Sequence, residues 1–160
     1  MRIAGILVAA AMLLTVFVWL TREDIMGEER ARETDTVLSI GLNPNAVDFS
    51  GYPGQNAETL TARIEAGNAA LRDAGFDIVL CLIPAGLDEA EAKVRECLAG
   101  GDFRVAMIGA GVRMAPEHTL LFERLLNVIT ELSPGIRFCF NTSPETTIDA
   151  VRRWVEPRAH

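Results

Sequence analysis

The hydrophobic positions of the chain form one long uninterrupted run near the N-terminus, followed by several short runs. The long run extends from Ile3 to Leu20 and contains no charged side chain. The short runs are rich in β-branched residues and end at Pro, Gly or Asn, as buried strands do. Between them lie segments in which apolar residues recur every three or four positions, the spacing of one helix face. The pattern therefore predicts a hydrophobic N-terminal helix and then an alternating β/α domain.

Local start and stop signals set the expected bounds of the elements. Gly75 ends the first helix of the domain, and Asp88, with Glu91 three residues later, predicts a capped start for the second. Ser143, followed by Pro and Glu, predicts the start of the last helix. The expected strands are residues 36–42, 77–83, 103–108 and 136–140, and the expected helices are residues 57–74, 88–99, 116–132 and 144–154.

This strict alternation predicts an α/β fold with a four-stranded parallel sheet that is covered by helices on both faces. Right-handed crossover connections favour the flavodoxin-like strand order 2-1-3-4. We therefore divide the chain into a transmembrane anchor (residues 1–21), a charged linker (residues 22–35) and one α/β domain (residues 36–156).

The N-terminal run is interpreted as an uncleaved membrane anchor. At about 1.5 Å per residue, residues 3–20 just cross a hydrocarbon core of about 30 Å, with Trp19 at the interface. A cleaved signal peptide is the main alternative because Arg2 supplies a positive N-terminus, but no small-x-small cleavage site follows the run. A true start at Met26 is a further alternative, which would leave a soluble cytoplasmic protein.

Opposing signals bear on the side of the membrane where the domain lies. Arg2 favours an N-terminus inside and therefore a domain outside. Arg22, Arg30 and Arg32 favour the reverse. So do three cysteines without a pairing pattern, because disulfides are rare in the cytoplasm. We expect a single-pass protein of the bacterial inner membrane with its domain in the cytoplasm.

Composition and motifs exclude several classes of function. The net charge is −7 and no basic stripe is interleaved with aromatic residues, so we expect no nucleic-acid partner. The sequence contains no P-loop, no Gly-x-Ser-x-Gly elbow and no HExxH motif. One of the two histidines is the terminal His160 and the carboxylates are scattered, so we expect neither a metal site nor a cofactor. Cys81 and Cys139 fall in apolar strands without CxxC spacing, which predicts core packing rather than a disulfide framework.

The candidate binding site lies at one edge of the predicted sheet. Ligands of such sheets bind beyond the carboxyl ends of the strands, near the point where the strand order reverses. Here that point lies between the strands at residues 36–42 and 103–108, and the loops there are rich in Gly, Pro, Asn and ionisable residues. We expect these loops to converge on one crevice. The candidate ligand-binding residues are Asn43, Asp48, Gly109, Gly111, Arg113, Glu117, Asn141 and Thr142.

Arg113 and His118 have the most specific candidate roles. Arg113 follows two glycines and could bind a carboxylate or phosphate through two hydrogen bonds. Alternatively, it pairs with Glu117 or Asp48 in an ordinary turn. His118 lies in the first turn of an expected helix and suits general acid–base catalysis. Alternatively, its ring binds a loop carbonyl.

Two strings, PEHTLLFE (residues 116–123) and CFNTSP (residues 139–144), are the most specific motifs of the chain. Together with IGLNPNAVDFS (residues 40–50) and IGAGVR (residues 108–113), they resemble a group of small, uncharacterised bacterial α/β proteins. The resemblance covers about residues 37–154. It implies the same fold and carries over no catalytic role. The hydrophobic N-terminal run departs from the form typical of the group, which begins near the first strand.

Three functions are compatible with these observations. The first is a membrane-tethered domain that binds a small anionic molecule or serves as a scaffold. The second is a small hydrolase or isomerase that uses His118 as acid or base and Arg113 as an anion clamp. The third is a structural subunit of a membrane complex. Because the sequence shows no nucleophile–base pair, binding is preferred to catalysis.

Overall fold

The computed structural model describes residues 36–157. The strands are β1 (Val37–Leu42), β2 (Ile78–Ile83), β3 (Val105–Ile108) and β4 (Arg137–Phe140). The helices are α2 (Ala57–Asp73), α3 (Leu87–Ala99), α4 (Ala110–Arg113), α5 (Thr119–Leu132) and α6 (Thr147–Arg152), with 3-10 turns η1 (Pro44–Ala46), η2 (Pro116–His118) and η3 (Pro144–Thr146). The predicted anchor and linker lie outside the described residues. Within residues 36–157, no helix combines the length and the apolarity that crossing a membrane requires.

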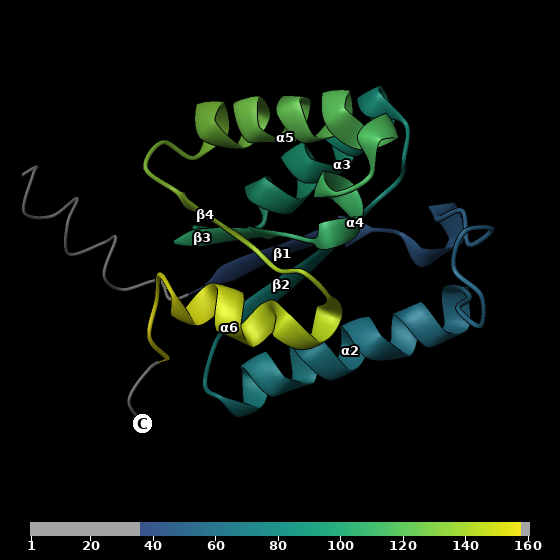
Figure 1. Ribbon diagram of the computed structural model, residues 1–160. Helices are drawn as coiled ribbons and strands as arrows, with labels where there is room; N and C mark the ends of the chain where they lie inside the picture. Colours follow the sequence, from purple (N-terminus) through teal and green to yellow (C-terminus); the bar gives the residue numbers. More distant parts are fainter. Residues whose placement is uncertain (1–35, 158–160) are drawn as a thin grey trace, which may run out of the picture. The chain divides into compact units, whose positions relative to one another are not determined.

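The four strands form one parallel sheet in the order β2-β1-β3-β4, which confirms the predicted topology. Helices α3 and α5 cover one face of the sheet, and α2 and α6 cover the other (Figure 1). The strands are mainly apolar because helices cover both faces of a parallel sheet. The carboxyl ends of the strands meet at one edge, where the loops leading into α2, α4 and α6 begin.

The two faces of the sheet are packed to different extents. On the face of α3 and α5 a continuous core runs along the whole sheet, from Leu38 to Leu42 in β1. On the face of α2 and α6 the core gathers at the amino ends of the strands. Its buried members are Val37, Leu71, Phe76, Val105, Met107, Cys139, Ala150, Val151 and Val155. The carboxyl half of that face therefore lacks a packed apolar cover.

Two predicted helix starts have different outcomes. Ser143 does begin the last helical segment, and the Thr146 hydroxyl accepts a hydrogen bond from the backbone N–H of Ser143 (3.1 Å). The capped start at Asp88 is wrong, because the N-cap of α3 is Gly86, two residues earlier. Asp88 instead accepts a hydrogen bond from Arg124 of α5 (2.6 Å). The Asp88 side chain therefore forms an ion pair with α5 instead of capping α3.

The prediction for Cys81 is also wrong. Cys81 in β2 forms a disulfide with Cys97 in α3, across a Cα–Cα distance of 6.1 Å. The crossover from strand to helix brings these positions together although they are 16 residues apart in sequence. The prediction for Cys139 is confirmed, since this residue is buried and free. The cysteines therefore no longer support a cytoplasmic domain, because disulfides persist mainly in oxidising compartments.

Residues 35–160 are expected to fold without the rest of the chain. They form one compact unit that includes all four strands and both apolar cores. A unit with its own core and no missing strand is expected to fold alone. The experiments below therefore use this unit, with a cooperative thermal transition as the check on folding.

Candidate ligand-binding cleft

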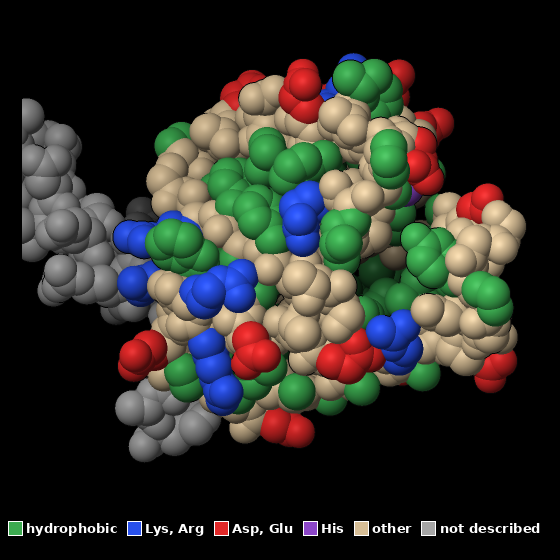
Figure 2. All heavy atoms as spheres, in the orientation of Figure 1, with side chains coloured by type: hydrophobic (Ala, Val, Ile, Leu, Met, Phe, Trp, Pro, Cys, Tyr) green, Lys and Arg blue, Asp and Glu red, His purple; other side chains and the backbone are tan. Residues whose placement is uncertain are grey.

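A cleft of about 600 Å³ lies between α2 and the exposed half of the sheet and opens at the carboxyl edge. Strands β1, β2 and β3 line one side of it, and α2 lines the other. Figure 2 shows the hollow to the right of centre, with apolar side chains inside it. Its volume falls within the range of about 300–1,000 Å³ that is typical of small-molecule sites.

The floor of the cleft is open because β1 presents small residues to it. Ser39 and Gly41 face the cleft between Leu80 and Leu82 of β2 and Met107 of β3. A Cβ atom added to Gly41 would meet only the side chain of Leu82, at 3.9 Å. A larger residue at Gly41 would therefore project into the cavity. Backbone and small side chains form a flat surface that a ligand can approach closely.

Helix α2 leaves the cleft open because it packs tightly only near its C-terminal end. Leu60, Ile64, Asn68 and Leu71 follow one another at helical spacing, but only Asn68 and Leu71 are buried. Close to them, a Cβ atom on Gly67 would lie 2.5 Å from the backbone oxygen of Pro144. This contact fixes α2 against the loop after β4, while its first turns stand away from the sheet.

Asn68 is the least satisfied polar residue of the cleft. Its side chain is 3% exposed, and its Nδ2 atom has no hydrogen-bond partner among the described residues. Leaving a buried donor without a partner costs about 1–3 kcal/mol, so such groups are rare in folded proteins. Because Asn68 lines the cleft, a bound molecule is the simplest source of the missing acceptor.

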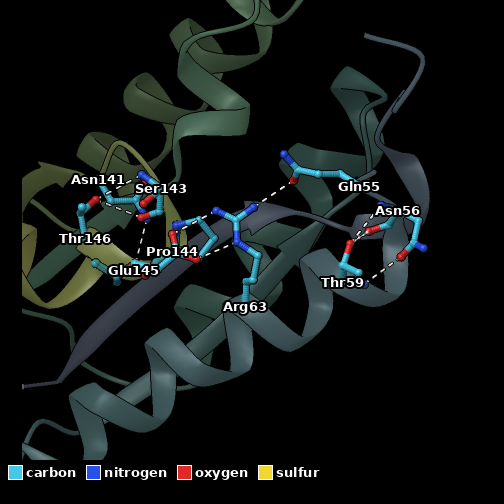
Figure 3. Close-up of polar contacts among 10 residues, drawn as sticks. Gln55, Asn56, Thr59, Arg63, Asn141, Ser143, Pro144, Glu145 and Thr146 are labelled. Carbon is cyan, nitrogen blue, oxygen red and sulfur yellow. Dashed lines mark hydrogen bonds and ion pairs between the residues drawn. The ribbon is translucent and has the colours of Figure 1, made fainter. Parts of the chain in front are cut away.

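Arg63 joins three segments at the mouth of the cleft. Its Nε and Nη2 atoms donate to the carboxylate of Glu145 (2.7 and 3.0 Å), and its Nη1 donates to Gln55 Oε1 (2.9 Å). Figure 3 shows Arg63 reaching from α2 to Gln55 on one side and to the loop that carries Glu145 on the other. The guanidinium holds the pKa of Glu145 at about 2, below its usual 4.5, chiefly through these hydrogen bonds and with help from Ser143.

We expect Glu145 to titrate at about pH 2 in the folded domain. Its pKa is lowered on folding, so the stability from the ion pair is fully present above pH 4.5 and is lost as the pH falls towards 2. The energetic effect is small, about 0.5 kcal/mol, because both side chains are partly exposed. Carboxyl-carbon NMR would measure the midpoint, and Arg63→Gln should return it towards 4.5. A wild-type midpoint near 4.5 would contradict the ion pair.

Most of the predicted site residues line this cleft. They are Asp48, Gly109, Gly111, Glu117, His118, Asn141 and Thr142. Asn43 does not line it, and its side chain accepts a hydrogen bond from the Asn45 N–H (3.0 Å), as an Asx turn requires. The loops after β1 and β3 do converge, as expected.

Arg113 lies outside the lining of the cleft. Its Nη2 donates to the backbone oxygen of Asn141 (3.0 Å), and its guanidinium stacks on the ring of Phe140 (5.5 Å to the centroid). Neither of the acidic partners considered from the sequence, Glu117 or Asp48, holds it. The side chain therefore joins the β3 and β4 loops rather than facing a ligand.

His118 and Asn141 both bind the loop after β3. The Nδ1 atom of His118 lies 3.0 Å from the Gly111 carbonyl, which can only accept, so Nδ1 is the donor and Nε2 is left outside this contact. The Oδ1 of Asn141 accepts from the Ala110 N–H (2.9 Å), and its Nδ2 donates to Thr147 (2.8 Å). Both polar atoms of the Asn141 side chain thus bind within the domain, whereas His118 retains a nitrogen for a ligand.

Sequence reasoning missed the side of the cleft that α2 and β2 provide. The missed residues are Leu60, Arg63, Ile64, Asn68, Leu80 and Leu82. A signal was present in α2, where Asn68 interrupts an apolar stripe at a position that should face the core. A second signal was the pair Ser39 and Gly41, which are small residues in an otherwise apolar strand.

The donor set of the cleft does not fit a metal ion, since no group of His, Cys, Asp and Glu side chains with suitable spacing occurs in residues 36–157. Neither protein-family models nor curated proteins give a match to the chain. The resemblance to small bacterial α/β proteins therefore stays a prediction from the motifs. The fold and the cleft define the chain as a parallel α/β domain with a candidate small-molecule site.

Proposed function

We propose that this domain binds a small, largely apolar molecule in the cleft between α2 and the sheet. The observation that carries the proposal is the cleft itself, because it replaces a packed core over half of one sheet face. Leaving apolar surface unpacked forfeits burial energy of about 25 cal/mol per Å². A ligand that fills the cleft would recover this energy.

The charges of the cleft do not favour the anionic ligand that the sequence analysis expects. Among the described lining residues, Arg63 is the one Lys or Arg, and Glu145 already neutralises it. Asp48 and Glu117 also line the cleft. Since Arg113 is engaged elsewhere, little positive charge is left to attract an anion.

Gly41→Val is expected to abolish ligand binding while the domain stays folded. The valine Cβ would lie at the floor of the cleft with no backbone atom within 4 Å, and valine suits a strand better than glycine does. A thermal-shift screen of small metabolites against residues 35–160 would measure the effect. A ligand at about 100 times its Kd stabilises the folded state by about 2.7 kcal/mol, and the variant should lose this gain.

Gly101→Val is the matched control for this experiment. Gly101 precedes β3 at the amino edge of the sheet and does not line the cleft, and the nearest atom to an added Cβ there is 3.9 Å away. This variant should keep the ligand-induced shift. If hits of the screen shift wild type and Gly41→Val equally, the cleft is not the binding site and the proposal fails.

Catalysis by His118 is the second candidate, favoured by the Nε2 atom that its contact with Gly111 leaves for a ligand. In this case a bound molecule would be converted, and His118→Gln would stop turnover while binding persisted. Mass spectrometry of each screening hit after incubation measures this. Unchanged hits would count against an enzyme.

The membrane anchor at residues 3–20 likewise stays a proposal, which membrane fractionation of the full chain would test.

A further inference from the structure

We infer that the ligand of the cleft is an uncharged molecule whose acceptor oxygen, of the amide, ester or ketone class, binds Nδ2 of Asn68. The inference rests on the proposed function and adds to it the chemistry and the orientation of the ligand. It is carried by the orphaned donor, the position of that donor along α2 and the charges of the surrounding residues.

The position of Asn68 sets the orientation. Leu60, Ile64 and Asn68 line the cleft in that order along α2, and eight residues of helix span about 12 Å. Leu71, one turn beyond Asn68, is fully buried in the core. Asn68 therefore lies at the closed end, and the opposite end of the lining, near Leu60, lies beside the loop after β1.

The chemistry at the closed end is neutral: Nδ2 of Asn68 lies there without a partner, and the hydroxyl of Ser39 also lines the cleft. Nδ2 of an amide can only donate, so it favours an oxygen acceptor and disfavours an ammonium group. A carboxylate there would be buried without a cation, because Arg63 lies more than one turn nearer the mouth and is bound to Glu145. An unpaired buried charge costs far more than a neutral polar group that is hydrogen-bonded. A neutral carbonyl satisfies the donor at the lowest desolvation cost.

The apolar residues that line the cleft determine the chemistry of the rest of the ligand. Ile64 of α2, Leu80 and Leu82 of β2 and Met107 of β3 all line the cleft. Leu80 is 36% exposed, so part of this apolar surface is in contact with water when the cleft is empty. An alkyl chain or a ring that extends from the carbonyl towards the mouth would cover it.

The test compares octanamide with octanoate, which have the same chain and differ in charge. N-phenyl-1-naphthylamine, a neutral apolar dye that fluoresces in apolar surroundings, reports occupancy of residues 35–160. At pH 7.5, octanamide should displace the dye at a concentration about tenfold lower than octanoate, because both offer an acceptor oxygen to Asn68 but only octanoate buries a charge. Both compounds are used below the concentrations at which they form micelles.

Asn68→Leu separates the hydrogen bond from general apolar binding. The variant should weaken octanamide roughly tenfold and leave the affinity for the dye, which has no carbonyl, nearly unchanged. Gly41→Val should lose the dye and octanamide together.

The outcomes separate the chemistry of the ligand from the presence of a binding site. If octanoate binds as tightly as octanamide, or if Asn68→Leu leaves octanamide affinity unchanged, the inference is overturned, while dye binding that depends on Gly41 still supports a small-molecule site. If the dye and octanamide fail to bind, or bind equally to Gly41→Val, both the inference and the proposed function are overturned.

Discussion

Replacing Cys81 and Cys97 together by alanine is expected to lower the free energy of unfolding by about 3 kcal/mol. The disulfide closes a loop of 16 residues between β2 and α3, and removing it gives the unfolded chain more conformational freedom. Cys81 is fully buried, so the missing sulfur adds a small packing loss. Urea denaturation of residues 35–160, followed by circular dichroism, would measure the change.

Cys139→Ala serves as the control for the loss of a buried sulfur. Cys139 is 1% exposed and free, and burial raises the pKa of its thiol to about 12. Its replacement should cost about 1 kcal/mol or less, and dithiothreitol should destabilise wild type and Cys139→Ala but not the double variant. If the double variant is as stable as Cys139→Ala, the cross-link does not stabilise the domain.

Gly67→Ala is expected to destabilise the domain by about 1 kcal/mol, although helix propensity alone predicts the opposite. Alanine inside a helix gains about 1 kcal/mol over glycine. At Gly67, however, the added Cβ would lie 2.5 Å from the backbone oxygen of Pro144, so α2 and the loop after β4 must separate. Overpacking of this kind costs about 1–3 kcal/mol, and we expect it to exceed the gain.

Ala69→Gly is the matched change in the same helix. Ala69 is exposed, so this substitution should cost about 1 kcal/mol through propensity alone. The structure predicts that both substitutions destabilise the domain, whereas a loose contact at Pro144 predicts opposite signs. Thermal unfolding of both variants decides between the two. A stabilised Gly67→Ala variant would show that α2 is not fixed against this loop.

The unequal packing of the two sheet faces connects these predictions to the cleft. The disulfide ties the edge strand β2 to α3 on the filled face, while Leu80 and Leu82 of the same strand face the cleft. Gly67 holds the C-terminal half of α2 close to the loop after β4, and the first half stands away from the sheet. These contacts bound the cavity on the sides of β2 and α2.

The candidate site could be predicted in part. Asp48, Gly109 and His118 were expected at one crevice because the carboxyl ends of parallel strands share an edge, and this rule depends only on topology. Arg113 shows the limit of the rule, since its loop is at the right place but its side chain turns to a carbonyl and to Phe140. The direction of one side chain depends on contacts that are distant in sequence.

The sequence by itself determined the alternation of strands and helices, the parallel sheet and its strand order. These follow from hydrophobic periodicity and from the handedness of crossovers, which are local properties of the chain. Only the tertiary structure decided the disulfide, the ion pair of Asp88, and the cleft with Asn68 at its closed end. Each depends on how closely two elements approach in space. That distance is set by the packing of the whole domain, so a one-dimensional pattern does not contain it.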